Sequence, residues 1–253
     1  MGHAPAFAPW RRSSMTKLKS WGVSHPGSVR KHNEDDMLAR ADLGLWAVAD
    51  GAGGHESGEL ASGMIVEALQ LLPQFLSAAD VLTQMRQALS QVHDTLRTEA
   101  QSRGRGGVIA STFVALILRD GRYTCLWAGD SRAYLLRAGM LTQLSRDHSL
   151  VQELVDTGKL AAEDAEHHPH ANVITRAVGA DDRLELDKVT GLIEDGDIFL
   201  LCSDGLSKVL TLEQIAGLLN SADGQDPAQA LVAAALAAHA RDNVTAMVVS
   251  AAH

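Results

Sequence analysis

Acidic residues beside glycine, or just before a strand, recur along this sequence. The residues in this setting are Glu34, Asp35, Asp50, Asp130, Asp204 and Asp242. A side chain at the end of a strand is held in a fixed position, and a neighbouring glycine lets another backbone segment approach it closely. Convergent carboxylates without a matching Cys or His pattern favour hard ions such as Mg²⁺ or Mn²⁺. Taken singly, each aspartate is better explained as a turn former or helix cap. Their recurrence in a definite order favours a metal site.

The stretch 29–58 concentrates this chemistry. It contains Arg30, then Glu34 and Asp35, then an apolar run that ends at Asp50-Gly51. Carboxylates near a core are costly unless something neutralises them. A metal, a basic partner or plain solvent exposure would each satisfy that requirement.

These acidic residues lie in or next to strand-like segments, and the segments occur in clusters along the chain. We expect strands over 21–29, 37–50 (broken at 41–44), 111–120, 122–130, 132–140, 184–192, 197–205 and 243–251. Asp120-Gly121 and Ala138-Gly139 are hairpin signals. Links this short require antiparallel pairing.

Helical patterns separate the strand clusters. Apolar residues repeat at spacings of three and four over 57–76 and 79–103, and shorter helices are expected over 149–160, 211–219 and 226–240. Thr211 and Gln214 form a capping box, and Asp226 is placed as an N-cap before Pro227. The pattern is not a regular βαβ alternation, so we predict an α+β fold with two antiparallel sheets and helices outside.

Composition limits the classes of function. The chain has 253 residues, 46% of them hydrophobic, and a formal net charge of -9. The acidic balance argues against nucleic-acid binding through a broad basic face. No apolar run approaches the ~20 residues of a membrane span, and the N-terminus is a poor signal peptide. We expect a flexible tail over 1–17, buried reduced thiols at Cys125 and Cys202, and a cytoplasmic location.

Eight segments in order resemble the PP2C (PPM) family of metal-dependent Ser/Thr protein phosphatases, in its short bacterial form. They read RKHNED, VADGAGGH, ASTFVALI, AGDSRAYLL, LSRDHS, ITRAVG, LLCSDGL and RDNVTAMVV. The resemblance covers about residues 21–250. It implies a four-layer αββα sandwich, with two central antiparallel sheets flanked by helix pairs. It also implies one phosphatase domain over 18–253, with a flap segment at about 145–185.

The resemblance assigns roles by position. It implies that Asp50 bridges two metal ions and that the Gly51 carbonyl binds one of them. Asp204 and Asp242 would bind the other ion. Glu34 and Asp35 would bind metal directly or through water, and Asp130 would bind a third and weaker ion. Arg30 would be the phosphate-binding arginine, and Asn243 would orient water or phosphate.

One position departs from part of the family. Some members carry a histidine just after the Asp-Gly pair as a proposed general acid, and this chain has Ala52 there. Leaving-group protonation would then fall to water or to another group, with His55 as a weaker candidate. His148 is expected to fix its loop, and the EHHPH run at 166–170 is expected to be a solvated flap loop rather than a Zn²⁺ site.

The resulting prediction is a phosphatase that uses two or three Mn²⁺ or Mg²⁺ ions. It would hydrolyse phosphoserine and phosphothreonine by attack of a metal-bridging hydroxide. Phosphorylated proteins would be its substrates, a Ser/Thr kinase its counterpart, and a monomer its default state. Two alternatives stay open, namely a catalytically weak phosphoprotein-binding module and a phosphatase of small metabolites.

Overall fold

Two antiparallel β-sheets lie face to face at the centre of the computed structural model, which describes residues 17–53, 56–104, 107–221 and 225–252. The first sheet has the order β1 (Lys17–His25), β11 (Val244–Ala252), β10 (Ile198–Cys202), β7 (Arg132–Arg137) and β8 (Met140–Gln143). The second has the order β2 (Asp35–Arg40), β3 (Leu45–Ala52), β5 (Phe113–Arg119), β6 (Arg122–Ala128) and β9 (Asp187–Leu192), and β4 (Ala110–Ser111) pairs with β3. All pairings are antiparallel, as the short hairpin links require.

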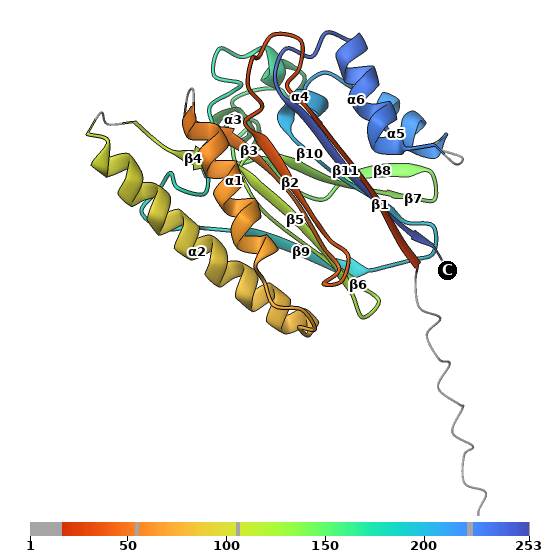
Figure 1. Ribbon diagram of the computed structural model, residues 1–253. Coiled ribbons are helices and arrows are strands. Elements are labelled where there is room, and N and C mark those ends of the chain that lie inside the picture. Colours follow the sequence, from red (N-terminus) through yellow and green to blue (C-terminus); the bar gives the residue numbers. More distant parts are fainter. Residues whose placement is uncertain (1–16, 54–55, 105–106, 222–224, 253) are drawn as a thin grey trace, which may run out of the picture.

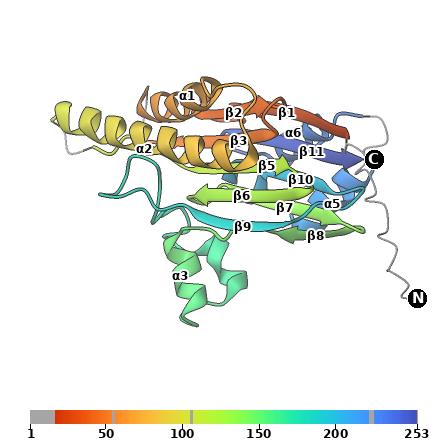
Figure 2. The same cartoon turned by 90° about the horizontal axis from the view of Figure 1, so that it is seen from below.

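Helix pairs cover the outer face of each sheet. The helices α1 (Glu56–Gln70) and α2 (Ala78–Ser102) lie on the second sheet, and α5 (Leu212–Asn220) and α6 (Pro227–Ala237) lie on the first (Figure 1). The predicted αββα sandwich is therefore confirmed. The helix α3 (Leu150–Asp156) projects away from the sandwich in Figure 2. A 3₁₀ helix (Ala162–His167) follows it, and the one-turn α4 (Asp204–Ser207) follows β10.

The central strands are buried on both faces because their side chains alternate between two cores. In β3, Leu45 and Ala47 face the helices α1 and α2, whereas Trp46 and Val48 face the opposite sheet. Strands covered on both sides read as continuous apolar runs, which explains why these segments show little polar alternation.

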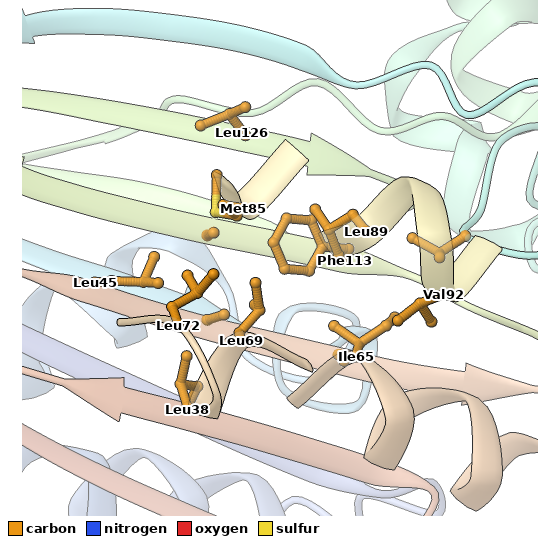
Figure 3. Packing of buried hydrophobic residues seen from close by; sticks show 14 of the residues in the cluster. Leu38, Leu45, Ile65, Leu69, Leu72, Met85, Leu89, Val92, Phe113 and Leu126 are labelled. Atoms are coloured by element: carbon orange, nitrogen blue, oxygen red, sulfur yellow. The ribbon is translucent and has the colours of Figure 1, made fainter. Parts of the chain in front are cut away.

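A leucine-rich core joins α1 and α2 to the second sheet (Figure 3). Leu69 from α1, Met85 and Leu89 from α2 and Phe113 from β5 are fully buried in it. Side chains of this size stabilise the fold by about 1.5–3 kcal/mol each when fully buried. This core holds the strand that carries Asp50.

Several element boundaries differ from the sequence prediction. The helix predicted to reach residue 76 ends at Gln70, since Pro73 lies in the connection that follows. The strand predicted over 21–29 begins earlier and ends at His25, because Pro26-Gly27 turns the chain. The segment 132–140 divides into β7 and β8 at Ala138-Gly139, whose positive φ angles of 49° and 79° form the hairpin turn.

Two further boundaries bear on the site. Asp204, predicted at a strand end, is instead the first residue of α4 after the N-cap Ser203. The segment predicted as a loop over 161–172 contains the 3₁₀ helix.

Cys125 and Cys202 are buried free thiols, as predicted. None of the described helices combines the length and the apolar character that a bilayer crossing requires.

The predicted N-terminal tail falls almost wholly on residues 1–16, which lie outside the described part of the chain. Lys17, which we placed at its end, already belongs to β1 and pairs with Ala252. The first described strand is therefore fastened along its whole length to the last one.

Candidate metal centre

Five aspartates from both sheets meet at one end of the sandwich. Asp35 opens β2 directly opposite Asp50 on β3, Asp130 follows β6, Asp204 opens α4, and Asp242 precedes β11. Burial raises the pKa of Asp50 well above its ordinary value, and the charges of the other four aspartates raise it further. The sequence-predicted acids are thus brought together, and their mutual repulsion calls for positive charge.

Asp35 is buried, with 7% of its surface exposed. Its Oδ2 accepts hydrogen bonds of 2.7 Å from the hydroxyls of Ser203 and Thr245. Its Oδ1 is buried and has no partner. Burial raises the pKa of Asp35 to about 7, against the opposing effect of the two hydroxyls.

The backbone at Asp50 is fixed by hydroxyl residues of the neighbouring strand. Its carbonyl accepts from the Thr112 amide at 2.8 Å and from Ser111 Oγ at 3.0 Å. Its amide donates to Thr112 Oγ1 at 3.2 Å, and that hydroxyl shares a 2.7 Å hydrogen bond with Ser131. Thr112 therefore links the Asp50 strand end to the loop that carries Asp130.

Glu34 and the Gly51 carbonyl converge on the first turn of α1. Glu34 Oε2 lies 2.7 Å, and Gly51 O 2.8 Å, from the place that a Cβ on Gly58 would occupy. A Cβ on Gly51 would in turn lie 2.1 Å from the Gly58 carbonyl. Only glycine fits at either position. The Glu34 carboxylate and the Gly51 carbonyl, both predicted from the sequence as metal ligands, therefore pack directly against Gly58.

Asp130 and Asp204 share one cation of the chain itself. Lys208 Nζ lies 2.6 Å from Asp204 Oδ2 and 3.4 Å from Asp130 Oδ2. Asp130 is 4% exposed, and its Oδ1 has no partner. Burial and the charge of Asp204 raise its pKa to about 6, although Lys208 acts in the opposite direction.

Arg30 lies at the open rim of the cluster. Its guanidinium donates to Asp242 Oδ2 at 2.8 Å, and its side chain is 53% exposed. The hydrogen bond to Asp242 raises the pKa of Arg30. The guanidinium fork is therefore both anchored beside the acids and open to solvent, where a phosphate can reach it.

Asn243 does not have the role that we expected. Its Oδ1 accepts from the Glu34 amide at 2.8 Å, and its Nδ2 donates to the carbonyls of Pro26 and His32 at 3.0 and 2.9 Å. Both amide hydrogens are used within the protein, which leaves none for a phosphate. We therefore correct that assignment, since Asn243 holds the loop that carries Arg30 and Glu34.

Several positioning residues were missed by the sequence reasoning. They are the hydroxyl residues around the acids and one lysine, namely Ser111, Thr112, Ser131, Ser203, Thr245 and Lys208. For Ser131, Ser203 and Thr245 the signal available was a small hydroxyl residue one to three positions from an acid, as in GDSR, CSDG and DNVT.

The segment expected to be a flap is fixed at its root by the SRDHS run. Arg132 on β7 makes a bidentate ion pair with the partly buried Asp147. His148 bonds with Gly129 through its backbone amide and its Nδ1, as we expected for a loop-fixing residue, and its Nε2 contacts Asp187. The root is thus tied to the turn that holds Asp130.

The remaining sequence candidates contribute little to this site. Ala52 is the last residue of β3, and His55 lies outside the described residues. His167 ends the 3₁₀ helix and is exposed. In the described parts of the chain, no three His, Cys, Asp or Glu residues surround a single ion position.

The residues present nonetheless fit hard divalent cations. All candidate donors are oxygens, and two buried carboxylate oxygens lack any partner. Mg²⁺ usually keeps several waters and takes only one or two carboxylates, so a cage of three protein groups around each ion is not required. Aspartates shared between ions, with water completing the coordination, would match that preference.

Comparison with known proteins shows the family. Residues 22–246 match the family model described as protein phosphatase 2C. The chain belongs to the protein phosphatase 2C family. The Ser/Thr phosphatase stp of Listeria monocytogenes is 33% identical over 231 residues, which cover 88% of this phosphatase 2C chain and 92% of that protein.

Solved structures resemble this phosphatase 2C chain over nearly its full length. PppA, described as a key regulatory component of T6SS in Pseudomonas aeruginosa, is 44% identical with a TM-score of 0.85, covering 92% of this chain and 97% of that one. The catalytic domain of the serine threonine protein phosphatase PstP, in complex with 2 manganese ions, is 33% identical with a TM-score of 0.83, covering 93% and 99%.

Proposed function

We propose that this protein is a Mn²⁺- or Mg²⁺-dependent phosphatase that hydrolyses phosphoserine and phosphothreonine in proteins. The observation that carries the proposal is the cluster of five aspartates with the exposed guanidinium of Arg30 at its rim. A partly buried group of acids next to an open phosphate-binding fork suits cation-assisted phosphate hydrolysis and is costly for a purely structural role.

One group of residues in the cluster would bind the cations. Asp50, Asp204, Asp242 and the Gly51 carbonyl would bind the ions, with Glu34 acting directly or through water. When bound, two divalent ions activate water for attack and neutralise charge that develops on the phosphate.

Other side chains would position these groups. Arg30 would orient the phosphate through two parallel hydrogen bonds, and its ion pair with Asp242 would shift as the phosphate arrives. Asp35 would set the orientation of its neighbours through its bonds to Ser203 and Thr245. Ala52 supplies no proton, so the leaving serine or threonine oxygen would take its proton from solvent water.

The first experiment is hydrolysis of a chromogenic aryl phosphate by the purified chain with Mn²⁺, with Mg²⁺ and with EDTA. Activity should require the metal and should fall by at least about a hundredfold in Asp204→Asn. The matched control is Asp120→Asn, because Asp120 lies in an exposed hairpin turn with φ 52° that asparagine accepts readily. Metal-independent hydrolysis, or full activity in Asp204→Asn, would refute the proposal.

Substrate class is tested with phosphothreonine, phosphoserine and phosphotyrosine peptides. A preference for the first two supports the protein phosphatase. Equal turnover of small metabolites and peptides would favour the small-molecule alternative. Binding of phosphopeptide without turnover, with metal bound, would favour the binding module.

We also propose a cytoplasmic location, a partner Ser/Thr kinase and a monomeric state. The net charge of -9 and the family membership support this proposal. Light scattering after gel filtration would test the state of assembly, and a mass consistent with a dimer would overturn that part.

A further inference from the structure

A single ammonium group connects two acids of the candidate metal centre with the segment expected to be the flap. Lys208 follows α4 and stands one helical turn after Asp204. Its Nζ lies 2.6 Å from Asp204 Oδ2, 2.9 Å from Asn172 Oδ1 and 3.4 Å from Asp130 Oδ2. An ammonium has three N–H donors, so these three acceptors use its full capacity.

The acids need this charge. Asp130 is 4% exposed, and one of its carboxylate oxygens has no partner at all. A buried carboxylate beside a second acid is stable as an anion only when a cation compensates it. Lys208 Nζ forms ion pairs with both carboxylates, at 2.6 Å from Asp204 and 3.4 Å from Asp130, so its positive charge compensates the two acids.

Solvent and ions have a route to this position. A cavity of about 260 Å³ lies beside it and is lined by Asp130 and Lys208 from the sandwich and by His167 and Asn172 from the segment that follows α3. The side chain of Lys208 is 27% exposed, and its stem of four carbons can swing the ammonium toward that cavity.

We propose that Lys208 is a built-in cation of the Asp130–Asp204 pair, which takes the place of an additional divalent ion and ties the flap to the metal centre through Asn172. The inference rests on the proposed metal centre. A divalent ion can enter between Asp130 and Asp204 only by displacing the ammonium, and that displacement breaks the bond to Asn172. The chain should therefore bind two divalent ions tightly and a third one only weakly.

The test counts bound Mn²⁺ by the electron paramagnetic resonance signal of the free ion during titration of the full chain. The wild type should bind two ions tightly. Lys208→Met should bind a third at least about tenfold more tightly than the wild type does, because a competing positive charge is gone. The double variant Lys208→Met with Asp130→Asn should lose that third ion again.

A matched control separates this local effect from a change in net charge. Lys19→Met removes the same charge from an exposed position on β1, about 20 Å along the strand from His25 and the acids. It should bind Mn²⁺ as the wild type does. If Lys208→Met does not fold, Lys208→Gln repeats the test, since its amide retains donors but no charge.

A second readout needs no metal. In EDTA, trypsin should cleave after Lys159 and Arg176, which flank Asn172, several-fold faster in Lys208→Met and in Asn172→Ala than in the wild type. Unchanged cleavage in both variants would overturn the tie to the flap.

The outcomes separate this inference from the proposed function. Two tight ions in every variant, or three in the wild type and in Lys208→Met alike, would overturn the role of Lys208 while leaving the metal centre intact. A chain that binds no Mn²⁺ in any variant would overturn the metal centre, and this inference with it.

Discussion

Substituting Gly58 by alanine sets helix stability against the geometry of the metal centre. Alanine in place of glycine normally stabilises a helix by about 0.5–1 kcal/mol. At Gly58 the added Cβ would lie 2.7 Å from Glu34 Oε2 and 2.8 Å from Gly51 O. The glutamate can move, but the Gly51 carbonyl belongs to the backbone of β3. Overpacking of this kind costs about 1–3 kcal/mol, more than the helix gains.

The same helix supplies the control. Gly63 lies five residues further along α1, and a Cβ there would meet nothing within 4 Å. Gly63→Ala should raise the melting temperature by about 2–4 °C per kcal/mol gained, with unchanged activity. Gly58→Ala should lower the melting temperature and the Mn²⁺-dependent activity, the latter by about tenfold or more, because the Gly51 carbonyl, which we propose as a metal ligand, is displaced.

The assay is the initial rate of aryl phosphate hydrolysis against Mn²⁺ concentration, together with calorimetry of both variants. Gly58→Ala, unlike Gly63→Ala, should need a higher Mn²⁺ concentration for half-maximal activity. If both variants are stabilised alike and both keep wild-type activity, the close packing of Gly58 has no part in holding Glu34 and the Gly51 carbonyl.

Three further predictions follow from the site. Thr245→Val removes one of the two hydroxyl donors to Asp35, so Mn²⁺ affinity measured by titration calorimetry should fall at least about tenfold; unchanged affinity would contradict this. Arg30→Lys keeps a positive charge beside Asp242 but loses the planar fork, so kcat/KM should fall about 10–100-fold, mainly through KM; wild-type kinetics would argue against phosphate binding at Arg30. In EDTA, the folded state holds protons on Asp35 and Asp130 up to pKa values of about 7 and 6, against 3.8 ordinarily. The melting temperature of metal-free protein should therefore fall as the pH rises from about 4 to 7, and Mn²⁺ should reverse the fall at pH 7; a rise over that range would refute the assignment.

The fold was predictable because apolar runs and turn residues agree along most of the chain. Asp120-Gly121 and Ala138-Gly139 do form the hairpin turns, with φ angles of 52°, 70°, 49° and 79°. Thr211 with Gln214 does form a capping box. Local chemistry of this kind is decided within a few residues, so the sequence alone contains it.

Contacts between distant segments were not predictable in the same way. Asn243 was expected to orient water or phosphate because it stands beside Asp242, yet its amide bonds with backbone more than 200 residues away. The ammonium of Lys208 also meets Asp130 only after two sheets and a helix have packed. Proximity in sequence indicated which loop each residue belongs to but not what its side chain contacts.

The position of β11 has a consequence for the timing of activity in the cell. This strand lies between β1 and β10, although it follows every other described element along the chain. Asp242 stands just before it, and its Thr245 holds Asp35. A nascent chain that does not yet include β11 therefore has a gap between β1 and β10 in the first sheet and an incomplete acid cluster. Addition of β11 completes both at once, so a chain without this strand cannot bind metal or remove phosphate as the folded domain does.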